Sequence, residues 1–326
     1  MPRTLRCAIF ALLCGAHACQ APSPAQDPRE VARLAVELGD DRRAVHLWTQ
    51  LWQASGHADL EAALEAARAV ARTGDRAGAL AILRHHVARF PDAGPAWSEL
   101  GAQALAAGDA AAAEAAFVAA RALQPEDTRA AAGLAQLLRE RGEPERALEV
   151  LEATAVAARA RVTSEAPAPA ADPRMAEERG RAALAAGRYR EALPAFRDAF
   201  AVLPAARRSR ADLLALAAAL AALPEPRWAD AERPLQWLAE ARAAGPNDAA
   251  LPRAIASVYR ALGRPADTVE PAREALARDP GDLDALALLL AALAALGRHE
   301  EHAAAAAHAE ALALTPEERA RVGLSP

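Results

Sequence analysis

Stretches of apolar residues, mostly alanine and leucine, run along the chain in a helical pattern and are separated by single glycines. Alanine and leucine are strong helix formers. No stretch alternates apolar and polar residues as a half-buried strand does. The sequence therefore predicts an all-α protein in which helices alternate with tight turns. The glycines that open these turns are Gly39, Gly74, Gly108, Gly142, Gly187, Gly263 and Gly297.

The turn glycines are regularly spaced. Successive gaps are 35, 34, 34, 45, 76 and 34 residues, which indicates a repeat of about 34 residues. The gap of 76 holds two such periods and 8 further residues. We therefore expect one degenerate repeat there, with helices at about 207–222 and 230–244 and an inserted loop at 223–230. The count comes to about eight repeats.

The clearest copy of the repeat spans residues 94–127. Its anchor positions are Trp97, Leu100 and Gly101 on the first helix, Gly108 at the turn, Ala113, Phe117 and Ala120 on the second helix, and Pro125 at its end. This pattern resembles the tetratricopeptide repeat. The resemblance implies an α-solenoid of about eight tetratricopeptide-like helix–turn–helix repeats, a fold that serves protein–protein interaction.

Each anchor type has a physical reason. Gly101 and Ala113 are small, so the two helices of a pair can approach closely. Phe117 is expected to fill the space between neighbouring pairs, and Pro125 stops its helix because proline cannot continue one. The Pro- and Ala-rich segment within 160–173 is interpreted as a linker, which divides the protein into four repeats over 29–159 and four over 174–316.

The first 18 residues have the features of a signal peptide. Arg3 and Arg6 precede an apolar run at 7–16 and a small-x-small end. The run is shorter than the roughly 20 residues that span a bilayer. A buried N-terminal helix is the alternative.

Cleavage after Ala18 would leave Cys19 as the first residue and the last cysteine of the sequence. This position resembles the lipidated cysteine of bacterial lipoproteins, although Ala16 and His17 depart from the usual motif. Residues 19–28 then form a flexible tether. The resemblance implies export to the periplasm or outer membrane, with membrane contact only through a lipid anchor; a soluble periplasmic protein is the alternative.

The sequence contains little catalytic chemistry. The net charge is −5 and no basic stripe suggests nucleic-acid binding. Nucleophile, P-loop and zinc-protease motifs are absent, and we expect no cofactor, no metal and no enzymatic activity. The best metal candidate is the pair His299 and His302, which is more simply the start of a solvated helix. The adjacent His85 and His86 are interpreted as surface residues.

The resemblance implies a concave face formed by the first helix of each repeat. The repeat register places these residues in the groove: Arg33, Arg68, Arg72, Gln136, Arg139, Arg181, Ser257 and Arg260. Arginine pairs bidentately with carboxylates, so an acidic peptide or the C-terminus of a partner protein is a reasonable ligand. The alternative is that these arginines are solvated or pair with neighbouring glutamates. Function therefore divides between a binding scaffold, a structural spacer without a groove ligand and, least favoured, a metal-dependent enzyme.

Overall fold

The computed structural model describes residues 27–161, 172–204, 207–245, 247–312 and 314–324. The predicted signal peptide, Cys19, most of the tether and the centre of the predicted linker lie outside these ranges. Every regular element in the described ranges is a helix. The protein divides into two compact units, residues 1–109 and 110–326, which we describe separately.

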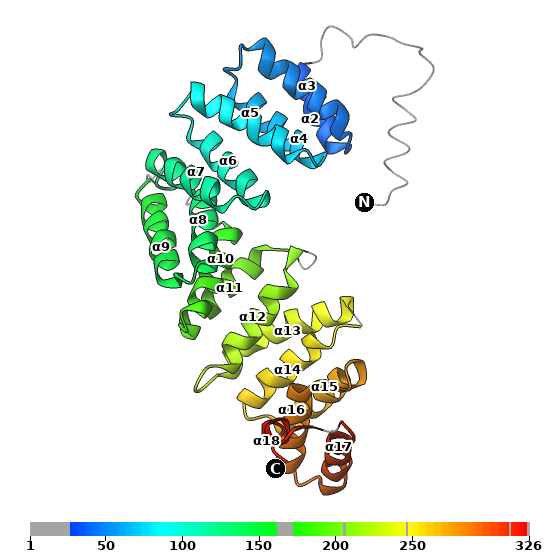
Figure 1. The fold of residues 1–326 in the computed structure, drawn as a ribbon. Helices are drawn as coiled ribbons and strands as arrows, with labels where there is room; N and C mark the ends of the chain where they lie inside the picture. The colour runs from blue at the N-terminus through cyan, green and yellow to red at the C-terminus, as the bar shows by residue number, and fades with distance from the viewer. Residues whose placement is uncertain (1–26, 162–171, 205–206, 246, 313, 325–326) are drawn as a thin grey trace, which may run out of the picture. The chain divides into compact units, whose positions relative to one another are not determined.

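Figure 1 shows the helices following one another as antiparallel pairs. Unit 1 contains α2 (Pro28–Glu37), α3 (Asp41–Ala54), α4 (Leu60–Arg72), α5 (Arg76–Arg89) and α6 (Gly94–Ala106). Unit 2 contains α7 (Ala110–Leu123), α8 (Thr128–Glu140), α9 (Pro144–Arg161), α10 (Pro173–Ala185), α11 (Tyr189–Val202), α12 (Arg210–Ala221), α13 (Trp228–Ala244), α14 (Ala250–Ala261), α15 (Pro265–Arg278), α16 (Leu283–Ala295), α17 (His299–Ala311) and α18 (Pro316–Arg321). The predicted fold class, an all-α solenoid of helix–turn–helix repeats, is confirmed.

The turns are built as the sequence predicts. All seven turn glycines have positive φ, between 66° and 93°, a backbone conformation that costs glycine little. At Gly108 the backbone N–H bonds back to Leu105, and the N–H of Asp109 bonds to the carbonyl of Ala104 at 2.9 Å, closing the helix end. The degenerate repeat has no such glycine, and α12 and α13 are joined instead by residues 222–227, so Trp228 begins a helix where we expected a loop.

Phe117 packs where the repeat pattern places it. It is 1% exposed, and the facing residue on α8 is Gly133. A Cβ added to Gly133 would come within 2.3 Å of the Phe117 ring, so the close approach requires glycine. Phe196 packs in a similar way on Gly180, where an added Cβ would lie 2.9 Å from the ring.

Helix packing continues from one side of residues 162–171 to the other. Helix α9 runs for 18 residues, since Arg159 stands where other repeats have a helix-ending proline. Helix α10 packs on both α8 and α9, and its N-cap Asp172 accepts a hydrogen bond from the Thr128 hydroxyl at 2.8 Å. The ends of the predicted linker are thus helical. The division into arrays at 29–159 and 174–316 stays a prediction; the sequence boundary between the two compact units lies elsewhere, after Asp109.

Candidate functional site

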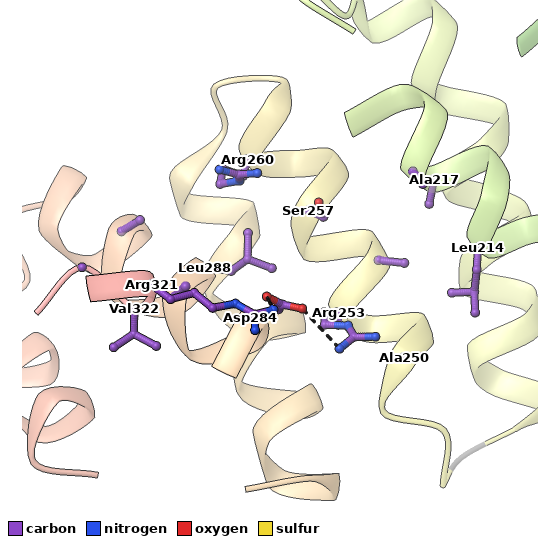
Figure 2. A pocket seen from close by; sticks show the side chains of 15 residues that line it. Leu214, Ala217, Ala250, Arg253, Ser257, Arg260, Asp284, Leu288, Arg321 and Val322 are labelled. Atoms are coloured by element: carbon purple, nitrogen blue, oxygen red, sulfur yellow. Dashed lines mark hydrogen bonds and ion pairs between the residues drawn. The ribbon is translucent and has the colours of Figure 1, made fainter. Parts of the chain in front are cut away.

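A pocket of about 600 Å³ opens among the first helices of the last repeats in unit 2. Helices α12, α14 and α16 supply its floor, which is mostly alanine with Leu214 and Leu288, and residues 321–323 at the end of α18 close one side (Figure 2). Alanines in strongly helix-favouring stretches keep the helices close without filling the space between them. The pocket is therefore apolar at its base and open to solvent.

Arginines stand around this apolar floor. Arg253, Arg260 and Arg321 line the pocket together with one carboxylate, Asp284. Arg321 pairs with Asp284 at 2.5 Å. Arg253 lies 3.1 Å from the buried carboxylate of Asp282 and 3.7 Å from Asp284. Two of the three guanidinium groups thus pair with these two carboxylates.

Arg260 carries the third guanidinium group of the pocket. The Arg260 side chain is exposed, and it forms no hydrogen bond or ion pair with any residue in the described part of the protein. Ser257 lies one turn earlier on α14 and also lines the pocket. Of the predicted groove residues, the structure brings these two together in a pocket.

The predicted groove residues on α8 and α10 have a different environment. Arg139 donates from Nε to Glu178 at 2.6 Å. Arg181 donates to Glu178 at 2.9 Å and twice to Asp212, both bonds being 2.5 Å. The side chains of Glu178 and Asp212 are only 4% and 2% exposed. Gln136 donates to Glu140 at 2.9 Å.

Burial and ion pairing shift the pKa values of Arg181 and Glu177. Hydrogen bonds to Asp212 raise the pKa of Arg181 further above its ordinary value, against the effect of burial. Burial raises the pKa of the Glu177 carboxyl, and the neighbouring Asp212 carboxylate raises it further. Three carboxylates thus gather around Arg181, with Glu177 the most distant at 3.9 Å.

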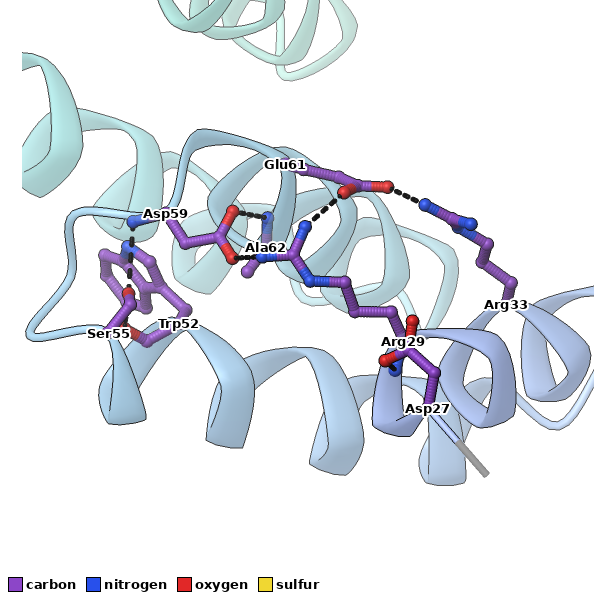
Figure 3. Close-up of polar contacts among 8 residues, drawn as sticks. All are labelled: Asp27, Arg29, Arg33, Trp52, Ser55, Asp59, Glu61 and Ala62. Carbon is purple, nitrogen blue, oxygen red and sulfur yellow. Dashed lines mark hydrogen bonds and ion pairs between the residues drawn. The ribbon is translucent and has the colours of Figure 1, made fainter. Parts of the chain in front are cut away.

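The predicted groove arginines of unit 1 are paired as well. Arg33 donates to Glu61 at 2.5 Å, and Arg29 bonds both Glu61 and Asp59, as Figure 3 shows. The hydrogen bond to Glu61 raises the pKa of Arg33, and the same bond lowers the pKa of Glu61.

Two more arginines of unit 1 follow this pattern. Arg68 pairs with the fully buried Glu99 at 2.8 Å and with Glu65 at 2.7 Å. Burial acts to lower the pKa of Arg68, but the two carboxylates outweigh it and raise the pKa. Arg72 donates to Asp41 at 2.7 Å. These arginines therefore connect neighbouring helices, the arrangement that the sequence left as the alternative to a ligand.

A sequence signal that we missed separates the paired arginines from the pocket. The residue nine positions before each turn glycine is acidic in most early repeats and apolar in the last two. In sequence order these residues are Glu30, Glu65, Glu99, Gly133, Glu178, Ala254 and Leu288. Glu99 and Glu178 bind arginines of the preceding first helix, whereas Ala254 and Leu288 line the pocket. The pocket opens where this acidic row ends.

Other candidates have ordinary structural roles. His299 begins α17, and in the described ranges no three His, Cys, Asp or Glu side chains are placed to hold a metal ion. His85 is exposed, but His86 is 1% exposed, so its assignment to the surface was wrong: it lies on the inner side of α5. Burial lowers the pKa of His86. None of the described helices is both long and apolar enough to cross a bilayer.

Comparisons with known proteins agree with this architecture. Residues 104–162 match the family model described as tetratricopeptide repeat, and no curated protein matches the sequence. The C-terminal part of a TPR repeat-containing protein from Cytophaga hutchinsonii is 16% identical, with a TM-score of 0.51 over 81% of this chain and 99% of that one.

Two further solved structures align less closely. YrrB, described as a TPR protein with an unusual peptide-binding site, is 14% identical over 63% of this chain and 95% of its own, with a TM-score of 0.49. MamA from Desulfovibrio magneticus is 21% identical over 56% and 90%, with a TM-score of 0.41. The protein thus has the fold of tetratricopeptide repeat proteins, and its residues 104–162 carry that family's signature.

Proposed function

We propose that this protein is a protein-binding scaffold and that the pocket of α12, α14, α16 and α18 takes an acidic segment of a partner protein. The observation that carries the proposal is Arg260, an exposed guanidinium above an apolar floor with no partner among the described residues. Helix faces of repeat proteins are common binding surfaces, and the fold supports protein–protein interaction in general.

The pocket chemistry suits a carboxylate attached to a small apolar segment. A guanidinium presents parallel N–H donors that match the two oxygens of a carboxylate, and Ser257 offers a further hydroxyl donor. Beneath them, Leu214, Leu288 and the alanines offer apolar area. An Asp or Glu carboxylate flanked by alanine or leucine, or the C-terminal carboxylate of a protein, would satisfy both parts of the pocket.

The N-terminal segment suggests where the scaffold acts. We propose that the protein is exported and held at the envelope by a lipid on Cys19, with a soluble periplasmic protein as the alternative. Metabolic labelling with an alkyne fatty acid tests the anchor. Label should be incorporated by the natural protein and lost in Cys19→Ser; a natural protein without label supports the soluble form.

A structural spacer is the second candidate function, and a specific observation favours it. Arg33, Arg68, Arg139 and Arg181 all pair with carboxylates of the protein itself. Most of the expected groove charge therefore holds the helices together. A metal-dependent enzyme acting through His299 and His302 has the least support, since these residues begin a partly solvated helix.

Site-directed photocrosslinking separates the scaffold from the spacer. A photoreactive amino acid at Ala291, an exposed residue of the pocket wall, would be incorporated into the full-length protein in native envelope preparations, and crosslinked peptides would be sequenced by mass spectrometry. A scaffold gives a recurrent partner peptide with an Asp, a Glu or a C-terminus near the crosslink. Arg260→Glu should abolish it, while the exposed Arg179→Glu, outside the pocket, should not.

The spacer gives the opposite result. No recurrent peptide would then crosslink at Ala291, or the same peptides would be captured by Arg260→Glu as by the natural protein. Either result would remove the pocket from the function.

A further inference from the structure

Two aspartates at the start of α16 have different environments. Asp282 is the N-cap of the helix: it accepts from the backbone N–H groups of Asp284 and Ala285 at 3.1 Å, pairs with Arg253, and its side chain is 5% exposed. Asp284 lies two residues later in the first turn of the helix, and its side chain is 49% exposed. Its partners, Arg321 and Arg253, both line the pocket (Figure 2).

Asp284 is the single carboxylate among the described residues that line the pocket. It pairs with Arg321 as a carboxylate from outside would, and it lies 3.7 Å from Nη1 of Arg253, the nitrogen that also pairs with Asp282. Asp282 caps its own helix in the buried base, so its carboxylate has a structural reason to be there. Among the described residues, the carboxylate of Asp284 pairs with pocket arginines alone, a placement that suits a role in selecting what enters.

We propose that Asp284 sets the charge selectivity of the pocket, so that the pocket accepts a segment with one carboxylate and rejects one with two. This inference rests on the proposed function. With Asp284 in place, one ligand carboxylate can reach Arg260. A second one, close in the same ligand, would compete with Asp284 for Arg321 and meet a like charge at short range. Removing the Asp284 carboxylate frees Arg321 and leaves Arg253 paired with Asp282 alone, so the preference moves to ligands with two carboxylates, one for Arg260 and one for Arg321.

The test is a selection that requires no knowledge of the natural ligand. A random hexapeptide library, displayed through its C-terminal end so that Asp and Glu supply the only carboxylates, would be selected on the full-length natural protein and on Asp284→Asn in parallel. Peptides from the natural protein should carry one Asp or Glu, and those from Asp284→Asn two. In fluorescence anisotropy, a two-carboxylate peptide should bind Asp284→Asn about tenfold more tightly than the natural protein.

Three control variants isolate the charge of Asp284. Asp284→Glu keeps the carboxylate and should select as the natural protein does. Glu310→Gln removes an equal charge from an exposed site outside the pocket and should change nothing. Arg321→Gln releases α18 from its ion pair but leaves the Asp284 carboxylate in place, and should weaken binding of two-carboxylate peptides.

Each remaining outcome has a distinct meaning. Acidic peptides that depend on Arg260 in both proteins, with unchanged carboxylate numbers, would overturn the role of Asp284 and leave the proposed function intact. If Arg321→Gln also binds two-carboxylate peptides more tightly than the natural protein does, the effect comes from the loosening of α18 and the inference is overturned. No peptides enriched relative to Arg260→Glu would overturn the proposed function, and the inference with it.

Discussion

Arg139 and Arg260 occupy the same place in their repeats, three residues before a turn glycine, but they have different environments. Arg139 is partly buried and bonded to Glu178 on the next first helix, at 2.6 Å. Arg260 is exposed beside a pocket and has no partner among the described residues. The two lie on α8 and α14 of the same compact unit.

The next repeat accounts for the difference. Nine residues before its turn glycine, the repeat after Arg139 has Glu178, whereas the repeat after Arg260 has Leu288. An arginine in this register therefore connects two repeats when a carboxylate follows, and is available to a ligand when none does. The identity of the arginine alone does not decide between structure and binding.

The largest predicted difference between the two regions is in the loss of stability when an arginine is replaced by alanine. Arg181→Ala leaves the buried Asp212 carboxylate without its arginine and Glu178 with Arg139 alone, and should destabilise the protein by about 3 kcal/mol. Arg260→Ala removes an exposed side group without a partner among the described residues and should change stability by less than about 0.5 kcal/mol. Urea unfolding followed by circular dichroism measures both.

The test is the difference in stability between Arg181→Ala and Arg260→Ala, and not either stability change alone. Arg179→Ala, on the same helix as Arg181 but exposed, serves as the control for lost charge and helix propensity. Equal unfolding midpoints for Arg181→Ala and Arg260→Ala would show that the buried ion pairs do not stabilise unit 2, and the proposed division of roles would be wrong.

A carboxylate added near Arg260 should give the pocket the kind of ion pair that Arg139 and Arg181 form. Leu288 stands where the partner of Arg139 would stand, and Ala291, three residues later on α16, is exposed and lines the pocket beside Arg260. Ala291→Glu gives Arg260 a partner at an exposed site, so stability should change little while affinity for acidic peptides falls about tenfold. Ala294→Glu adds the same charge on an exposed part of α16 outside the pocket lining, and should retain binding.

Much of the fold is accessible from sequence because it follows from local rules. The seven turn glycines require positive φ, and their spacing alone gives the repeat and the helix pairs. Phe117 was assignable to the core for the same reason. The start of α13 at Trp228 was missed, because the degenerate repeat has no turn glycine to fix its register.

The site was harder to predict because it depends on pairs of repeats. Reading the first helices one at a time placed Arg68, Arg181 and Arg260 in one class, as groove residues. Whether each has a partner depends on a residue about 30 positions later, which becomes visible only when the rows of two repeats are read together. Nor does the sequence register place Arg321 of the short helix α18 beside Asp284.

The smallest predicted effect concerns pH and arises in the paired region. Burial and the Asp212 carboxylate raise the pKa of Glu177 above its ordinary value, so the folded protein holds this proton at a pH where the unfolded protein has lost it. Its contribution to stability is therefore fully present below the ordinary pKa of a glutamate and is lost as pH rises through the folded-state pKa.

Replacing Glu177 by glutamine removes a charge that is unfavourable at neutral pH. Glu177→Gln should raise the unfolding midpoint at pH 7.5 by an amount equivalent to less than about 1 kcal/mol, because Arg181 and solvent offset most of the repulsion. The gain should shrink as the pH falls towards 4, where the natural glutamate is protonated too. Glu310→Gln, on an exposed part of α17, should show no such trend. A gain that is constant with pH would show that the effect does not come from the ionisation of Glu177. A loss at pH 7.5 would mean that Arg181 holds the Glu177 carboxylate as firmly as it holds Glu178 and Asp212, and that the paired region has no excess of negative charge.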